Sequence, residues 1–333
     1  EFAQAVGAAY FGNKNRIEEI TEKSYQAIML DIDGVLRVID QKMDIDGYFI
    51  EKIASFANKE IPVVINSSRN FDSIYEILLN SLKPHISDDA QKFISLYIAE
   101  ENKLYLTNLS ETPRQYVATI PVFSDEQMKS MQEIVKYFIS AQAECKVKIV
   151  QLLSNNRGIR IKFTNFEEIL GNAAVLDNLV ARLRNIMKVQ GITYAVAVNT
   201  GIYLEIIPAD GNTKILAARH FAACFNIPPK RIACLADQAN SLGVDYQFMA
   251  FGTGFSTEKA YGKDMVSIAL KHSDAARWYM EHLKFESPYR ILFQCIQDDI
   301  KMHMVLSAVL KLFYIPDASL YHKKARKVIE IEY

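Results

Sequence analysis

Short apolar runs alternate with longer amphipathic segments over the first hundred residues, and this pattern predicts alternating strands and helices. Apolar runs at 25–30, 61–66 and 94–99 have the length of buried strands. Helical periodicity fills the intervals at 46–58 and 71–82, and Asp44 or Asp46 is a suitable N-cap for the first of these helices. Strands joined through helices form parallel sheets, so we expect a doubly wound α/β core.

The pattern changes in the middle of the chain, where paired strand-like segments replace the regular alternation. The expected strands are 117–122, 146–153, 158–163, 194–198 and 202–207, with helices at 125–140 and 174–189. Alternation then resumes with a helix at 214–225 and a strand at 231–235. We therefore expect a helical extension at 1–24, a core domain made of 25–102 and 206–255, an inserted α+β domain at 103–205, and a mostly helical extension at 256–333.

Composition narrows the class of protein. Half of the 333 residues are hydrophobic, which suits a large globular core. Basic and acidic residues number 38 and 39, so the chain carries no global field that favours nucleic acid or an anionic membrane. No apolar run reaches the length of a membrane span, the nearest being 302–315. Four scattered cysteines indicate reduced thiols and a cytoplasmic environment.

The first expected strand ends in two aspartates, Asp31 and Asp33, followed at once by Gly34. The strand gives way to a turn at this point, so the two carboxylates can converge at its C-terminal edge. Carboxylates placed together repel each other unless they share a cation or a proton. The same four letters recur from Asp44 to Gly47 without a preceding apolar strand, and there we interpret them as turn and helix-cap chemistry.

Three further groups of polar residues follow strands or open helices. Ser67, Ser68 and Arg69 follow the second strand, where hydroxyl and backbone N–H groups can hold a phosphate. Lys214 opens the helix after the insert and can neutralise an anion. Asp237 follows the strand at 231–235, and Asp245 comes eight positions later.

This series resembles the four motifs of the haloacid dehalogenase-like phosphohydrolase superfamily over about residues 25–255. The segment from Asp31 to Val35 resembles the first motif, Ser67 with Arg69 the second, Lys214 the third, and Asp237 with a later acid the fourth. An insert between the second and third motifs resembles the C2-cap branch. That branch includes Cof-type sugar phosphatases, sucrose-phosphatase-like enzymes and phosphomannomutases.

The resemblance implies a role for each residue. Asp31 would be the nucleophile that forms an aspartyl-phosphate, and Asp33 would be the general acid and base. Ser67, Ser68 and Lys214 would bind the phosphoryl group. The implied cofactor is Mg²⁺, held by Asp31, the backbone carbonyl of Asp33, Asp237 and Asp245.

The fourth motif departs from the Cof-type pattern. After Asp237 the chain continues with Asn240 and Ser241, where Cof-type members usually have an asparagine and a second aspartate. Asp245 instead resembles the longer spacing of phosphomannomutase-like members. The sequence leaves open whether Asp245 or Asn240 completes the metal site, and whether Arg69 contacts substrate or braces its loop.

The expected function is a Mg²⁺-dependent phosphatase that hydrolyses a small phosphorylated metabolite, with a sugar phosphate as the expected substrate class. Three alternatives remain: a phosphomutase of phosphomannomutase type, a phosphoprotein phosphatase, which a C2 cap disfavours because it restricts bulky substrates, and a binding or scaffolding protein that has lost catalysis. Insert residues that could contact substrate are Arg157, Arg160, Lys162, Asn199 and Tyr203. The two extensions leave open a homo-oligomer or further domains of a larger polypeptide, and the basic patch at 323–327 is interpreted as solvated.

Overall fold

The computed structural model describes residues 18–37, 45–67, 69, 71–109, 114–141, 147–163, 173–201, 203–258, 265–268, 270 and 272–288. Ser68, Asp44, most of the expected N-terminal helix, the apolar run at 302–315 and the basic patch at 323–327 lie outside these residues. The chain divides into two compact units, Glu1–Ser287 and Pro288–Tyr333, and the fold below belongs to the first. Within the described residues, no helix combines the length and the apolar character needed to cross a membrane.

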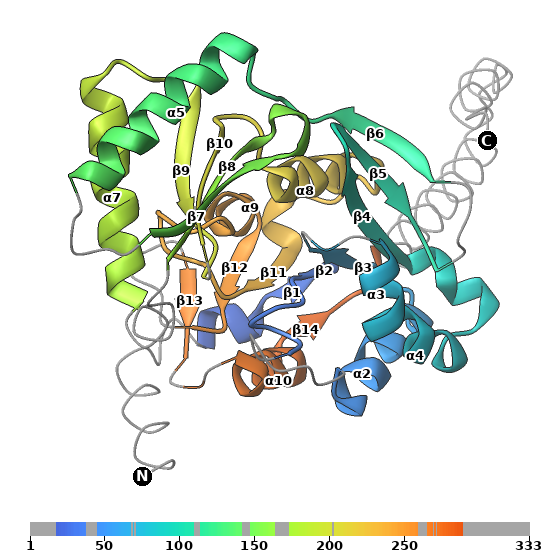
Figure 1. Ribbon diagram of the computed structural model, residues 1–333. Helices are drawn as coiled ribbons and strands as arrows, with labels where there is room; N and C mark the ends of the chain where they lie inside the picture. The colour runs from blue at the N-terminus through green and yellow to red at the C-terminus, as the bar shows by residue number, and fades with distance from the viewer. Residues whose placement is uncertain are drawn as a thin grey trace, which may run out of the picture. The chain divides into compact units, whose positions relative to one another are not determined.

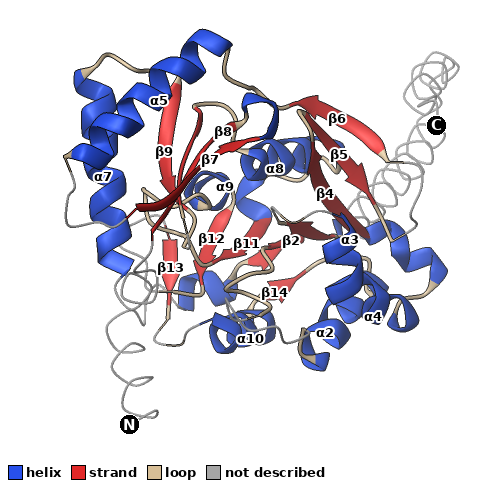
Figure 2. Ribbon diagram, viewed as in Figure 1, coloured by secondary structure: helices blue, strands red, loops and turns tan. Residues whose placement is uncertain are grey.

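An eight-stranded sheet forms the centre of the first unit, in the order β13-β12-β11-β2-β3-β4-β5-β6 (Figures 1 and 2). All pairs from β13 to β4 are parallel, and β5 and β6 extend the sheet antiparallel. The strands are β2 (Ala27–Leu30), β3 (Val63–Asn66), β4 (Ile94–Glu100), β5 (Lys103–Thr107), β6 (Gln115–Thr119), β11 (Ile232–Ala236), β12 (Thr253–Ser256) and β13 (Met265–Ser267). This arrangement confirms the expected α/β core with a mostly parallel sheet.

Helices cover both faces of this sheet, which explains why its central strands are apolar on both sides. Ile28 and Leu30 point into one hydrophobic cluster, while Ala27 and Met29 point into the other, as the two-residue period of a strand requires. The first cluster contains side chains of α2 (Gly47–Asn58), α3 (Phe71–Ile74), α4 (Asn80–Leu82) and α10 (His272–His282). The second contains side chains of α8 (Thr213–Cys224) and α9 (Tyr246–Phe251).

The helix expected at 71–82 is interrupted. A single π-helical segment, Tyr75–Leu79, lies between α3 and α4 and places one wider turn within the helical run. Short 3-10 helices also occur at Lys83–His85, Asp88–Phe93, Ser154–Asn156 and Pro229–Arg231. The helical period of the sequence therefore gave the extent of this segment but not its change of pitch.

A second, smaller sheet is antiparallel and has the order β7-β8-β10-β9. Its strands are β7 (Val147–Leu153), β8 (Gly158–Phe163), β9 (Ala195–Asn199) and β10 (Leu204–Pro208). Helices α5 (Asp125–Ser140) and α7 (Ala173–Val189) pack with it around a separate hydrophobic cluster (Figure 1). A capping box between Ser124 and Gln127 begins α5 at the expected residue. We call these four strands and two helices the cap.

The core sheet extends beyond the limits expected from the sequence. Strands β5 and β6 fall within the expected insert at 103–205, yet β5 pairs with β4 of the core sheet and β6 pairs with β5. Strand β13 and α10, placed in the expected C-terminal extension, add to the core sheet and its hydrophobic cluster. A short parallel pair, β1 (Ser24–Tyr25) and β14 (Lys284–Phe285), also joins the two ends of this unit. An alternating pattern identifies a strand but not the sheet that it joins, which explains these differences.

Candidate active site

The acids of the first and fourth motifs lie at one edge of the core sheet because their strands are parallel neighbours. Asp31 directly follows β2, and Asp237 directly follows β11. The backbone N–H of Asp31 donates to the carbonyl of Leu235 at 3.0 Å, continuing the ladder between the two strands. This is the carboxyl edge of a doubly wound sheet, where such folds place their sites.

A tight turn after Asp31 brings the chain back over this edge. Gly34 has a φ of +74°, and a Cβ there would lie 2.5 Å from Cγ of Asp237. Its N–H donates to the carbonyl of Arg37 at 2.8 Å, and its own carbonyl accepts from Oγ1 of Thr257 at 2.6 Å. Glycine is therefore required both for the backbone angle and for the close approach of Asp237.

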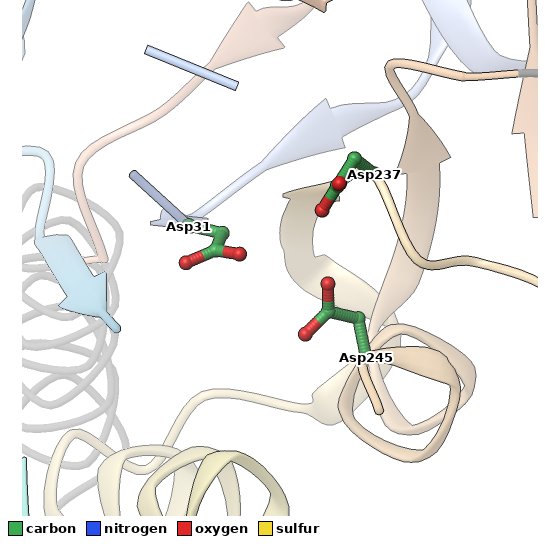
Figure 3. A group of neighbouring side chains, drawn as sticks. All are labelled: Asp31, Asp237 and Asp245. Atoms are coloured by element: carbon green, nitrogen blue, oxygen red, sulfur yellow. The ribbon is translucent and has the colours of Figure 1, made fainter. Parts of the chain in front are cut away.

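Three carboxylates converge at this edge (Figure 3). Asp31, Asp237 and Asp245 each place a carboxylate oxygen within 4.8 Å of the others, and all three residues are buried. Nζ of Lys214 lies 2.7 Å from Oδ2 of Asp31 and 2.5 Å from Oδ1 of Asp245. The structure thus brings together four of the residues that the sequence selected.

The charges in this cluster do not balance. Burial raises the pKa of Asp31 to about 7, and the charge of Asp245 adds to this rise while Lys214 opposes it. Burial and the charges of Asp245 and Asp31 also raise the pKa of Asp237 well above its ordinary value. Burial alone would lower the pKa of Lys214, but Asp245 and Asp31 outweigh it and raise that pKa. A divalent cation fits this donor set, because three buried carboxylates face one ammonium group.

Lys214 is held by residues that the sequence analysis missed. Asn212 is the N-cap of α8, and its Oδ1 accepts from the backbone N–H of Lys214 at 3.0 Å. Nδ2 of Asn66, at the end of β3, donates to the carbonyl of Lys214 at 3.0 Å. The preference for asparagine at an N-cap could have identified Asn212, whereas no local signal marks Asn66.

Gln238 was also missed, and it supports two of the acids. Its Nε2 donates to Oδ2 of Asp237 at 3.0 Å, and its backbone N–H donates to Oδ2 of Asp245 at 3.3 Å. The bond to Asp237 favours its ionised form and so opposes the rise of its pKa. The side chain is buried, so the amide is part of the site rather than of the surface.

Asp33 lies outside the carboxylate cluster and is held by Arg69. Nε and Nη2 of Arg69 donate to the two oxygens of Asp33, each at 2.8 Å, and Nη1 donates to Oγ of Ser73 at 3.1 Å. Oγ of the buried Ser67 accepts from the backbone N–H of Arg69 at 3.4 Å. Arg69 therefore joins the first and second motifs, and a two-point bond of this kind fixes the direction of the carboxylate.

Asn240 faces the cap, whereas Asp245 joins the acids. Nδ2 of Asn240 lies 3.3 and 3.2 Å from the two carboxylate oxygens of Asp177 in α7. Its Oδ1 accepts from the backbone N–H of Leu242 at 2.9 Å. Of the two residues that the sequence left open for the metal site, the geometry thus favours Asp245.

The basic and aromatic residues of the cap sheet contact one another. Nε of Arg160 donates to Oε1 of Glu205 at 2.6 Å, and its guanidinium lies 4.8 Å from the ring centre of Tyr203. Lys162 lies 5.4 Å from the same ring centre. Three of the expected substrate-contacting residues therefore form one cluster on β8 and beside β10.

Comparisons with known proteins show the family and the fold of this chain. The sequence profile of haloacid dehalogenase-like hydrolases matches residues 28–243, more than half of the chain. No curated protein matches. Among solved structures, IMP-bound IMP-nucleotidase of Plasmodium falciparum superposes with a TM-score of 0.58 at 15% identity, over 81% of this chain and 69% of that one.

Two further structures show the range of this similarity. An N-terminally truncated form of the same Plasmodium falciparum enzyme has a TM-score of 0.58 at 15% identity, over 82% of this chain and 72% of that one. A haloacid dehalogenase-like hydrolase from Bacteroides thetaiotaomicron has a TM-score of 0.47 at 16% identity, over 78% of this chain and 99% of that one. The likeness to the first two shows a shared fold. Because the family profile spans the strands that carry Asp31 and Asp237, this chain belongs to the haloacid dehalogenase-like hydrolase family.

Proposed function

We propose that this protein is a divalent-metal-dependent phosphatase that acts on a small phosphorylated metabolite. The observation that carries the proposal is the buried group of Asp31, Asp237 and Asp245 beside Lys214. These three carboxylates would hold Mg²⁺, which when bound would neutralise the charge of phosphoryl oxygens. Oxygen ligands of this kind are the ones that Mg²⁺ prefers in phosphoryl-transfer sites.

Asp31 would attack the phosphorus atom of the substrate. A bond forms between its carboxylate oxygen and phosphorus while the bond to the leaving oxygen breaks, and Asp33 gives that oxygen a proton. Asp33 then takes a proton from a water molecule, whose oxygen attacks phosphorus and releases inorganic phosphate and Asp31. Arg69 keeps the carboxylate of Asp33 in one direction through both of its oxygens.

Lys214 and Ser67 would bind the phosphoryl group. The ammonium of Lys214 already lies 2.7 Å from Asp31, so a phosphoryl group on that carboxylate falls within its reach. Ser67 is buried two residues before Arg69, and its hydroxyl can donate to a phosphoryl oxygen. Fixed donors of this kind stabilise charge that develops in the transition state. Ser68 would add a further hydroxyl at the same loop.

The substrate class that we propose is a sugar phosphate, because the position of the insert between the second and third motifs resembles the C2-cap branch, which includes sugar phosphatases. Nucleoside monophosphates belong in the same screen, since the fold is shared with an IMP-nucleotidase. A phosphomutase would return the phosphoryl group to a second sugar hydroxyl. A product assay separates the two activities, because only the phosphatase releases free phosphate in proportion to substrate consumed.

The test compares two aspartates from the repeated four-letter sequence. Asp31→Asn removes the nucleophile, and we expect the release of phosphate from a generic phosphoester to fall by at least about 10³-fold. Asp46→Asn is the matched control, because asparagine caps a helix as well as aspartate does. EDTA should abolish activity in the wild-type protein, and added Mg²⁺ should restore it. Equal turnover by Asp31→Asn and wild type would refute the proposal.

A further inference from the structure

The loop that joins Asp237 to Asp245 packs on the core through Ala239 and is also held by the cap. We call residues 238–244 the acid loop. Its Leu242 packs against the hydrophobic cluster of the cap rather than against either cluster of the core. The carbonyl of Ser241 accepts from Nη1 of Arg184 in α7 at 3.0 Å. The loop that carries two of the three acids at its ends is therefore part of the contact between cap and core.

The backbone of Asn199 adds a β-bridge to this contact. Its N–H donates to the carbonyl of Leu242 at 2.8 Å, and its carbonyl accepts from the N–H of Val244 at 2.9 Å. Asn199 ends β9 and pairs with Gly243 of the acid loop. The side chain is buried, and its Oδ1 accepts from the N–H of Gly201 at 2.7 Å. The last residue of cap strand β9 is thus hydrogen-bonded to the acid loop in the way that neighbouring strands of a sheet are.

Asp177 ties these two segments together from α7. One of its oxygens, Oδ1, accepts from Nδ2 of Asn199 at 2.9 Å. The amide of Asn240 donates to the same carboxylate, at 3.3 Å to Oδ1 and 3.2 Å to Oδ2. A single cap carboxylate therefore bonds the strand end that supports the acid loop and a side chain of the loop itself. Bonds to a charged acceptor are the stronger kind.

Repulsion between the acids indicates why contacts from the cap to the acid loop matter. Asp31, Asp237 and Asp245 repel one another and face a single ammonium group, so the position of the acid loop affects how closely Asp237 and Asp245 approach Asp31. The acid loop has internal bonds, such as that from the N–H of Gly243 to the carbonyl of Asn240 at 2.8 Å, but these fix its shape and not its position. From the core, Nδ2 of Asn212 donates to the carbonyl of Val244 at 2.8 Å. The remaining external bonds described above come from the cap.

We propose that Asp177 is a positioning residue: through Asn199 and Asn240 it holds the acid loop where Asp237 and Asp245 face Asp31. Docking of the cap and assembly of the metal site are then one event. The metal part of this inference rests on the proposed function. Asp177 itself acts at a distance from the reacting atoms, because its contacts are with the two asparagines.

The experiment removes the carboxylate of Asp177 in one variant and exchanges the hydrogen-bonding groups of Asp177 and Asn240 in another. Asp177→Ala removes the carboxylate, and Asp177→Asn keeps one acceptor while it offers an unmatched amide to Asn240. The double variant Asp177→Asn with Asn240→Asp restores a donor facing an acceptor. Glu126→Ala, an exposed position on cap helix α5, is the control. If Asp177→Ala does not fold, the comparison between Asp177→Asn and the double variant carries the test.

Two measurements are independent of turnover. Amide hydrogen exchange at 238–244 in metal-free protein should become about tenfold faster in Asp177→Ala and stay unchanged in Glu126→Ala. The Mg²⁺ concentration that half-saturates the rise in melting temperature should increase about tenfold, as for partners that orient metal ligands. The double variant should recover most of both effects. At saturating Mg²⁺, turnover by Asp177→Ala should return towards the wild-type value.

Three results would overturn the inference, the first two at Asp177 and the third at the proposed function. If Asp177→Ala melts at a lower temperature but leaves loop exchange and Mg²⁺ dependence at wild-type values, Asp177 is merely structural. Failure of the double variant to improve on Asp177→Asn leads to the same conclusion. If wild-type protein neither binds Mg²⁺ nor hydrolyses phosphoesters, the proposed function itself fails and the coupling to metal fails with it. The wild-type measurement therefore distinguishes the two failures.

Discussion

Two segments of this chain have the same four letters and different surroundings. Asp31 to Gly34 follows the buried strand β2, and Asp31 is itself buried beside Lys214. In the second segment, from Asp44 to Gly47, Asp46 is exposed and begins α2, with Oδ1 accepting from the N–H of Tyr48 at 2.9 Å. Its other oxygen pairs with Arg277 at 2.8 Å on the surface.

The difference lies in which neighbours each segment meets. Asp46 finds its cap partner two residues away, so local sequence is sufficient for its role. Asp31 meets Lys214 and Asp237, which lie far along the chain and reach it only through the order of the parallel strands. The glycines differ in the same way, since Gly34 has a positive φ against Asp237 whereas a Cβ at Gly47 would meet nothing within 4 Å.

The largest expected difference between the two segments is in the effect on turnover of replacing the second aspartate of each. Asp33→Asn removes the proposed proton donor, and we expect turnover of a phosphoester to fall by about 10²–10⁴-fold. Asp46→Asn should stay within about twofold of wild type, because its cap bond survives. Steady-state assays with Mg²⁺ present measure both. Equal losses in the two variants would remove the distinction between the segments.

The glycines provide the next test. Gly34→Ala would force a positive φ on alanine, and its Cβ would overlap with Asp237. The free energy of unfolding should therefore fall by about 2–4 kcal/mol. Gly47→Ala should be neutral or stabilise by up to about 1 kcal/mol, because alanine favours a helix and has open space there. Urea denaturation compares the two proteins. A stable Gly34→Ala protein would show that the turn can relax.

The smallest expected effect separates stability from activity in the second segment. Asp46→Ala loses the cap of α2 and a surface ion pair, and unfolding should cost about 1 kcal/mol less. Turnover should remain at the wild-type value, since α2 supplies no group of the proposed site. Thermal melts and phosphate release on the same preparation measure the two quantities. A drop in turnover beyond the fraction unfolded would contradict the structural role.

Much of the core and the cap could be predicted from periodicity. The expected helix at 46–58 appears as α2 and the expected strand at 158–163 as β8, because burial imposes a clear repeat on each. The sheet to which each strand belongs was harder to predict from the sequence. Strands β4 and β5 form a hairpin whose turn contains Glu101 at a φ of 50°, and nothing in their alternation shows that β5 stays with the core sheet.

The residues of the candidate site likewise divide into those that the sequence identifies and those that only the structure reveals. Residue type and place after a strand were enough to select Asp31 and Asp237, because the carboxyl edge of a parallel sheet gathers such side chains. The partners that hold them, including Asn66 and Gln238, carry no local signal. Asp177 lies in an ordinary helix of the cap, and only its contacts with the acid loop distinguish it.

The sequence by itself determined the alternation of the core, the chemical groups at the ends of its strands, and the family to which they belong. Tertiary structure decided which of two identical tetrapeptides is buried, which acid joins the cluster, and which sheet each hairpin enters. The physical reason is that propensity and period act over a few residues. Convergence of Asp31, Lys214 and Asp245 depends on strand order and on packing between segments that are distant in the chain.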